Sequence, residues 1–276
     1  MDKTAFVIVA DHGHTNTVAD ADHAIELEGR SNMELEYLIE SVCENGGCYD
    51  VKDTLLEASY SAVTGLNGGM AYIYVRNRAN DDWTKPARYE KDVLAMANAF
   101  YQANQTGRYS GAAAKNFDFI KGRVDMILVR DTESSNTFDG PPYVVYTGKN
   151  AQGQHQTESV PSWLARNPRP GYLRMDERLQ GLTRGHSASR TGDIILIPKY
   201  GEEADPDDRS YFGEELESWH GGISQDDLKI PLIVARPGAP KSATFAKVSS
   251  EVSAIPMHSD VPKIILKLLE DAPRRQ

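Results

Sequence analysis

The sequence predicts an α/β protein in which helices cover both faces of a mostly parallel sheet. Two unbroken apolar runs, at 6–10 and 194–198, read as strands that are buried on both faces, which is typical of parallel sheets. A third observation is the amphipathic segment 259–269, whose apolar stripe is expected to pack on that sheet as a helix. The three segments together predict a layered core.

Composition limits the classes of function. The chain has 276 residues with 40% hydrophobic and 25% charged side chains, which is ordinary for a globular protein of one large or two modest domains. The net charge of -10 argues against nucleic acid as a partner, because phosphate backbones are bound by clustered Lys and Arg. No apolar stretch approaches the roughly 20 residues of a membrane span.

Residues 1–64 are expected to form the first part of the core. A helix is predicted over 32–43, and the weaker pattern over 51–62 is compatible with helix or strand. Cys43 and Cys48 are separated by a flexible stretch that contains two glycines. They could close a small disulfide loop or remain two reduced thiols, and the spacing does not decide between these.

Residues 65–175 are predicted to be an α+β insertion, a cap that walls the site and selects the substrate or serves as a structural lid. The predicted elements are strands at 70–75, 124–130 and 143–147 and a helix at 89–103. The segment 148–171 is rich in Gln, Pro and Ser and is predicted to be loop.

Residues 176–276 are expected to complete the core. The strand at 194–198 is followed by an acidic loop at 201–209 and by another core strand at 232–235. In the closing helix, Asp260 is the expected cap and Pro262 lies in the first turn.

The candidate metal ligands are Asp11, His12 and His220. Asp11 and His12 directly follow the first buried strand, where open α/β sheets place their sites, and Gly13 lets the backbone turn so that both side chains can point one way. His14 and His23 are expected to be loop histidines, either of which could approach a metal or a substrate. Their spacing does not fit the His-x-His-x-Asp-His motif of metallo-β-lactamases, so that class is rejected.

This combination resembles the alkaline phosphatase superfamily, and within it the type I phosphodiesterase and nucleotide pyrophosphatase branch. The resemblance covers almost the whole chain in order and spacing. It is carried by Asp11-His12-Gly13, Asn67-Gly68-Gly69-Met70, Gly192-Asp193, His220-Gly221, Ile230-Pro231-Leu232-Ile233 and Asp260-Val261-Pro262.

The resemblance implies two divalent metal ions, zinc in the first place with Mn or Mg as alternatives. Asp11 and His12 would bind the metal that activates the nucleophile, and His220 would bind the other. Asp193 is expected to shape the turn before its strand, and Trp219 to hold His220 or simply to pack. The substrate would be a phosphate-ester small molecule or a nucleotide-like molecule, and the location exported or periplasmic.

The resemblance also implies residues that the sequence does not contain. The family places a metal-binding Asp, a Ser or Thr nucleophile and an Asp-x-x-x-His pair ahead of the Asp-His-Gly strand, and no relocated copy is found. The chain is therefore expected to be the C-terminal portion of a phosphoester or phosphodiester hydrolase, inactive alone, that folds poorly or associates with a separate N-terminal half. The alternatives are a non-catalytic remnant or binding module, a sulfatase or phosphomutase-type relative, and a generic α/β protein with incidental histidines.

Overall fold

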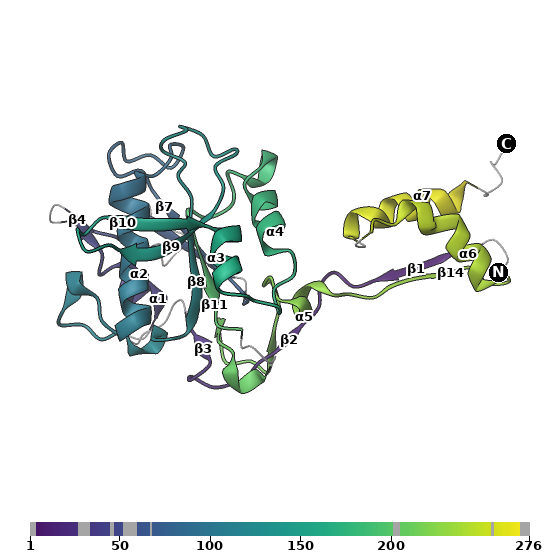
Figure 1. The fold of residues 1–276 in the computed structure, drawn as a ribbon, viewed down its shortest axis with the longest axis horizontal. Coiled ribbons are helices and arrows are strands. Elements are labelled where there is room, and N and C mark those ends of the chain that lie inside the picture. Colours follow the sequence, from purple (N-terminus) through teal and green to yellow (C-terminus); the bar gives the residue numbers. More distant parts are fainter. Residues whose placement is uncertain are drawn as a thin grey trace. The chain divides into compact units, whose positions relative to one another are not determined.

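The computed structural model describes residues 4–26, 34–44, 47–51, 60–66, 68–200, 205–254 and 257–270. The chain forms two compact units (Figure 1). The large unit is His14–Leu228, and the small unit combines Met1–Gly13 with Lys229–Gln276.

The large unit is built on a six-stranded sheet with the strand order β10-β9-β8-β11-β7-β6. The strands are β6 (Ala62–Leu66), β7 (Ala71–Val75), β8 (Val124–Val129), β9 (Val144–Lys149), β10 (His155–Ser159) and β11 (Ile194–Pro198). Every neighbouring pair is antiparallel. A hydrophobic core can therefore pack against each face of the sheet.

Helices cover both faces of this sheet (Figure 1). Ile194 and Leu196 of β11 face the core under α1 (Leu35–Ile39) and α2 (Leu94–Thr106), which is entered through a π-helical turn at Tyr89–Val93. Ile195 and Ile197 face the second core, which is closed by α3 (Val160–Arg166) and α4 (Met175–Leu182). The strand predicted at 194–198 is therefore buried on both faces, as expected.

The mix of helices and sheet is confirmed, but the prediction of a mostly parallel sheet is wrong for the described residues. Among the described strands, only β3 (Ala24–Ile25) and β12 (Tyr211–Phe212) pair in parallel. The physical reason is that an unbroken apolar run indicates a strand with both faces covered, and here helices cover both faces of an antiparallel sheet. Such a run carries no information on strand direction.

The remaining expected elements are present in the large unit, with one exception. Strands or helices occur at 70–75, 89–103, 124–130 and 143–147, and α1 lies within 32–43. The prediction of loop over 148–171 is wrong, because β10 and α3 lie there. Ser159 caps α3 by accepting from the Ser162 N–H, and Pro161 occupies its first turn. Of the open prediction at 51–62, residues 52–59 lie outside the described residues.

The compact units have different limits from the three predicted ranges. The strand β11, expected in the second core part, lies hydrogen-bonded between β7 and β8 of the expected insertion. Short pairs complete the large unit: β2 (Thr15–Asn16) with β13 (Ser218–Trp219), and β4 (Cys43–Glu44) with β5 (Gly47–Cys48), followed late in the chain by α5 (Gln225–Leu228). Cys43 and Cys48 form a disulfide across the second pair, which decides the alternative that the spacing left open.

The small unit is a two-stranded antiparallel ribbon with two helices. The ribbon pairs β1 (Phe6–Val9) with β14 (Leu232–Ala235), and the helices are α6 (Lys241–Val248) and α7 (Val261–Leu269). Asp260 accepts the N–H groups of Ser253 and Met257 and so stabilises the 3-10 turn His258–Asp260 before α7. Its side chain makes no cap hydrogen bond to α7, so the prediction that Asp260 caps this helix is wrong, while Pro262 lies in the first turn as expected.

The expectation that the first strand is buried on both faces and lies mid-sheet is wrong for the described residues. Phe6 is 48% exposed and Ile8 is 55% exposed, and β1 has one partner strand. Ile233, which pairs with Ile8, is exposed to a similar extent. Within this unit, the apolar side chains of β1 are thus only partly buried. Among the described residues, no helix combines the length and apolar character that crossing a membrane requires.

Candidate functional site

Asp11 and His12 lie in the small unit, directly after β1. The His12 N–H donates to Asp11 Oδ1 over 3.0 Å, and the Asp11 Oδ2 lies 3.4 Å from His12 Nε2. His12 Nδ1 lies 2.8 Å from the Gly13 carbonyl oxygen, which can only accept, so Nδ1 carries the proton. Nε2, the second ring nitrogen of His12, lies beside the Asp11 carboxylate. A carboxylate oxygen and an imidazole nitrogen therefore stand close together at the end of the strand.

The backbone before this pair is held from the C-terminal part of the unit. His258 Nε2 donates to the Ala10 carbonyl oxygen over 2.7 Å. The side chain of Asp11 is 86% exposed and that of His12 is 33% exposed, so both side chains are accessible from solvent. A carboxylate and an imidazole whose second nitrogen is held by a carbonyl are donor groups that suit zinc.

His220 lies in the large unit, immediately after β13. The pairing of Trp219 with Thr15 brings His220 beside His14, and the two imidazole rings lie 5.3 Å apart at an angle of 70°. His14 Nδ1 is 3.4 Å from the Ser218 hydroxyl. His14, expected only as a loop histidine, is thus a direct neighbour of the predicted ligand His220.

Two glycines let a second backbone segment pack against the His220 loop. The Gly69 N–H donates to the His220 carbonyl oxygen over 3.2 Å. A Cβ on Gly69 would lie 2.4 Å from the Gly222 Cα, and a Cβ on Gly68 would lie 2.6 Å from the His220 carbonyl oxygen. Gly68 also has a φ of +52°, so its conformation favours glycine as well. The Gly68-Gly69 pair therefore fixes the backbone of His220 from one side.

Asp227 also fixes this loop. Its carboxylate accepts the Thr15 hydroxyl and the Gly222 N–H, both over 2.6 Å, and its own N–H donates to the Ser224 hydroxyl. Burial raises the pKa of Asp227, against the opposing effect of these hydrogen bonds. This role of Asp227 was not predicted, because an acid before an apolar strand is typical of a solvated turn.

A pocket in the large unit adjoins this loop and encloses about 380 Å³ of empty space, part of it open to solvent. Its lining includes Thr15, Trp219, Asp227, Tyr200 and Arg209. Arg209 is almost fully buried. Its guanidinium stacks on the Tyr200 ring at 4.7 Å, donates to the Asn16 carbonyl oxygen over 2.6 Å and pairs with Asp226 over 3.2 Å.

Two further residues of the resemblance have structural contacts. The Asp193 carboxylate accepts the Val75 N–H over 2.8 Å and so ties β7 to the start of β11. Trp219 donates its indole N–H to the Glu214 carbonyl oxygen and packs 6.0 Å from the Tyr211 ring. Asp193 therefore shapes the sheet, and Trp219 packs beside the pocket.

The predicted ligands divide between the two units: Asp11 and His12 belong to the small unit and His220 to the large one. Their meeting at one binuclear centre stays a prediction. Within the described residues, no three His, Cys, Asp or Glu side chains gather as a metal site would require. Comparisons with protein-family models, with curated proteins and with solved structures gave no match for this chain.

Proposed function

We propose that the chain supplies part of the metal-binding machinery of a hydrolase that acts on phosphoesters or phosphodiesters. The observation that carries the proposal is the pair after β1, where the Asp11 carboxylate lies beside Nε2 of His12 and the Gly13 carbonyl oxygen contacts Nδ1. Asp11 and His12 would hold one divalent ion, zinc in the first place with Mn or Mg as alternatives, and His220 would hold a second. Such ions lower the pKa of a bound hydroxyl group and neutralise charge on phosphate oxygens.

The chain's own residues have defined tasks in this proposal. The Gly13 carbonyl holds the Nδ1 side of the His12 ring, so Nε2 is the nitrogen that would bind the metal ion. Gly69 and Asp227 hold the backbone around His220, which limits the freedom of that imidazole. The nucleophile and the remaining ligands would come from a separate N-terminal half, and the substrate would be a small phosphate ester or a nucleotide-like molecule.

Two structural features support the involvement of that further segment and an exported location. The ribbon face with Phe6, Ile8 and Ile233 is apolar and exposed, and burying such side chains is worth roughly 1.5–3 kcal/mol each. The Cys43–Cys48 disulfide is typical of proteins in oxidising compartments.

Zinc binding to the purified chain tests the proposal directly. Isothermal titration should show binding that Asp11→Asn or His12→Gln weakens by about tenfold or more. His186→Gln, at an exposed histidine of the large unit, is the matched control and should leave binding unchanged. Zinc binding that survives both the Asp11 and the His12 substitution would remove this pair from the metal site.

Activity is tested by co-expression with a polypeptide that supplies the nucleophile segment. Hydrolysis of a nitrophenyl phosphate ester or diester should appear in the complex and be lost in His220→Ala. Undiminished activity in that variant would remove His220 from the mechanism.

A second candidate is a non-catalytic binding module with the same fold. The pocket beside Trp219 favours it, because it adjoins aromatic side chains and buried polar groups without needing a metal. The two candidates differ in the complex: a binding module would take up a small molecule in the pocket without any hydrolysis.

A further inference from the structure

We propose that His23 is a pH-controlled latch, which in its doubly protonated form ties the loop before β3 to the acidic turn before β12 and releases that turn when it loses a proton. The proposal concerns the large unit alone and does not depend on the proposed hydrolase activity.

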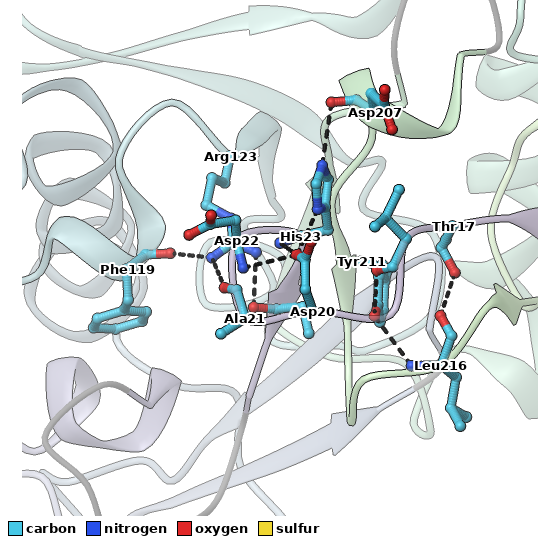
Figure 2. A network of polar contacts seen from close by, with 12 residues as sticks. Thr17, Asp20, Ala21, Asp22, His23, Phe119, Arg123, Asp207, Tyr211 and Leu216 are labelled. Atoms are coloured by element: carbon cyan, nitrogen blue, oxygen red, sulfur yellow. Dashed lines mark hydrogen bonds and ion pairs between the residues drawn. The ribbon is translucent and has the colours of Figure 1, made fainter.

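The geometry of the imidazole carries the proposal. His23 Nδ1 lies 2.6 Å from Asp20 Oδ1, and Nε2 lies 3.2 Å from the Asp207 carbonyl oxygen, 184 residues away in the chain. Figure 2 shows the ring between these two partners. A carboxylate and a carbonyl both only accept, while a neutral imidazole has one N–H. Only the doubly protonated ring therefore satisfies both contacts.

The charged groups around the ring act in opposite directions. Partial burial lowers the pKa of His23, but the hydrogen bonds to Asp20 and Asp207 and the charge of Asp20 outweigh it, so the pKa is raised. Arg123, which donates to the Ala21 and Ala24 carbonyl oxygens, opposes this rise by its positive charge.

Other acids lie close to the latch. Asp22 interacts with Arg123 and offsets part of its charge, and Asp208 in the latched turn is paired with Lys199 over 2.9 Å. Neither takes the place of Asp20, whose carboxylate also accepts the Asp22 and His23 N–H groups.

The latched segment leads directly into the pocket. Asp207 belongs to the 3-10 turn Pro206–Asp208, and the next residue is the buried Arg209 that stacks on Tyr200. The His23 carbonyl oxygen accepts the Tyr211 N–H over 3.1 Å, so the main chain of His23 holds the far end of this segment. The side-chain contact is the one that pH can remove, and it acts on the turn that precedes Arg209.

The direction of the pH effect follows from the raised pKa. A histidine whose pKa is higher in the folded state contributes stability below its unfolded value of about 6.5, and the contribution is lost as pH rises through the folded value. The latch is closed in acid and open in alkali.

Two measurements on the full chain test the latch. NMR titration should give a pKa for His23 above about 6.5, which Asp20→Asn should lower. Hydrogen exchange, corrected for intrinsic rates, should show Asp208 and Arg209 amides at least about threefold better protected near pH 5.5 than near pH 8.5.

Variants separate the latch from general effects of pH. His23→Gln should abolish the pH dependence of protection at Asp208 and Arg209, and His186→Gln should preserve it. A wild-type pKa at or below about 6.5, or equal pH dependence in His23→Gln, would overturn the proposal. The wild-type titration keeps the test valid even if His23→Gln fails to fold.

Discussion

The two units bury their apolar side chains to very different extents. In the large unit, Phe100 of α2 and all of Ile194–Leu196 in β11 are fully buried. In the small unit, Phe6 and Ile8 of β1 and Leu266 of α7 are about half exposed or more, and Ile264 is the only α7 residue fully buried among those described. Similar apolar patterns in the sequence thus lead to full burial in the large unit and to partial exposure in the small unit.

An apolar run therefore predicts that its side chains need to be buried, but it does not show that the same unit buries them. The run at 194–198 receives helices on both faces and a strand on each side. The run at 6–10 receives a single partner strand. The large unit is therefore expected to carry most of the stability of the chain.

The largest effect is expected from truncating a core side chain of the large unit. Phe100→Ala should lower the free energy of unfolding by about 3–5 kcal/mol, because it leaves a cavity in a closed core. Phe6→Ala is the matched substitution in the small unit and should cost less than about 1 kcal/mol. Urea unfolding followed by circular dichroism measures both. An equally large loss in Phe6→Ala would show that the ribbon face is covered in solution.

The next effect concerns the buried carboxyl group of Asp193. Burial raises the pKa of Asp193 to about 6. The folded state therefore binds the proton more tightly than the unfolded state, and stability should fall by roughly 3 kcal/mol as pH rises from about 4 to above 7.

Asp193→Asn should flatten this part of the stability profile, because an amide can still accept the Val75 N–H but does not titrate. Urea midpoints across the pH range provide the measurement. An unchanged slope in the variant would mean that other groups cause the dependence.

The smallest of the three effects is expected at the disulfide. Cys43 and Cys48 are five residues apart, so the loop they close is short and its removal should cost about 2 kcal/mol. The double variant Cys43→Ser/Cys48→Ser should show this loss in urea unfolding and should no longer respond to a reducing agent. A wild-type stability that is insensitive to reduction would contradict the expectation.

The sequence predicted most elements but not how they assemble. An apolar run located β11, an Ala-rich segment located α2, and an apolar stripe at helical spacing located α7, because these features are local in the sequence. The antiparallel direction of the sheet leaves no such signal. The polar β10 was missed because its exposed side chains lack an apolar alternation.

The site could be predicted only where chemistry shows in single residues. Asp11 and His12 were proposed as ligands from their position after a strand, and that role stays a prediction. Asp227 was not, because its contacts with Thr15 and Gly222 depend on the fold. His23 was likewise predicted only as a loop histidine, because its contact with Asp207 from a distant part of the chain depends on the fold.

The hydrogen bond between Thr15 and Asp227 joins residues 212 positions apart, at the beginning and the end of the large unit. Both crossings of the chain between the units therefore leave the large unit from one spot. Residues 14–228 therefore have the arrangement of an inserted domain whose two ends lie close together. Such a domain could be inserted into a loop of another protein, or removed from one, without distorting the domain or the loop.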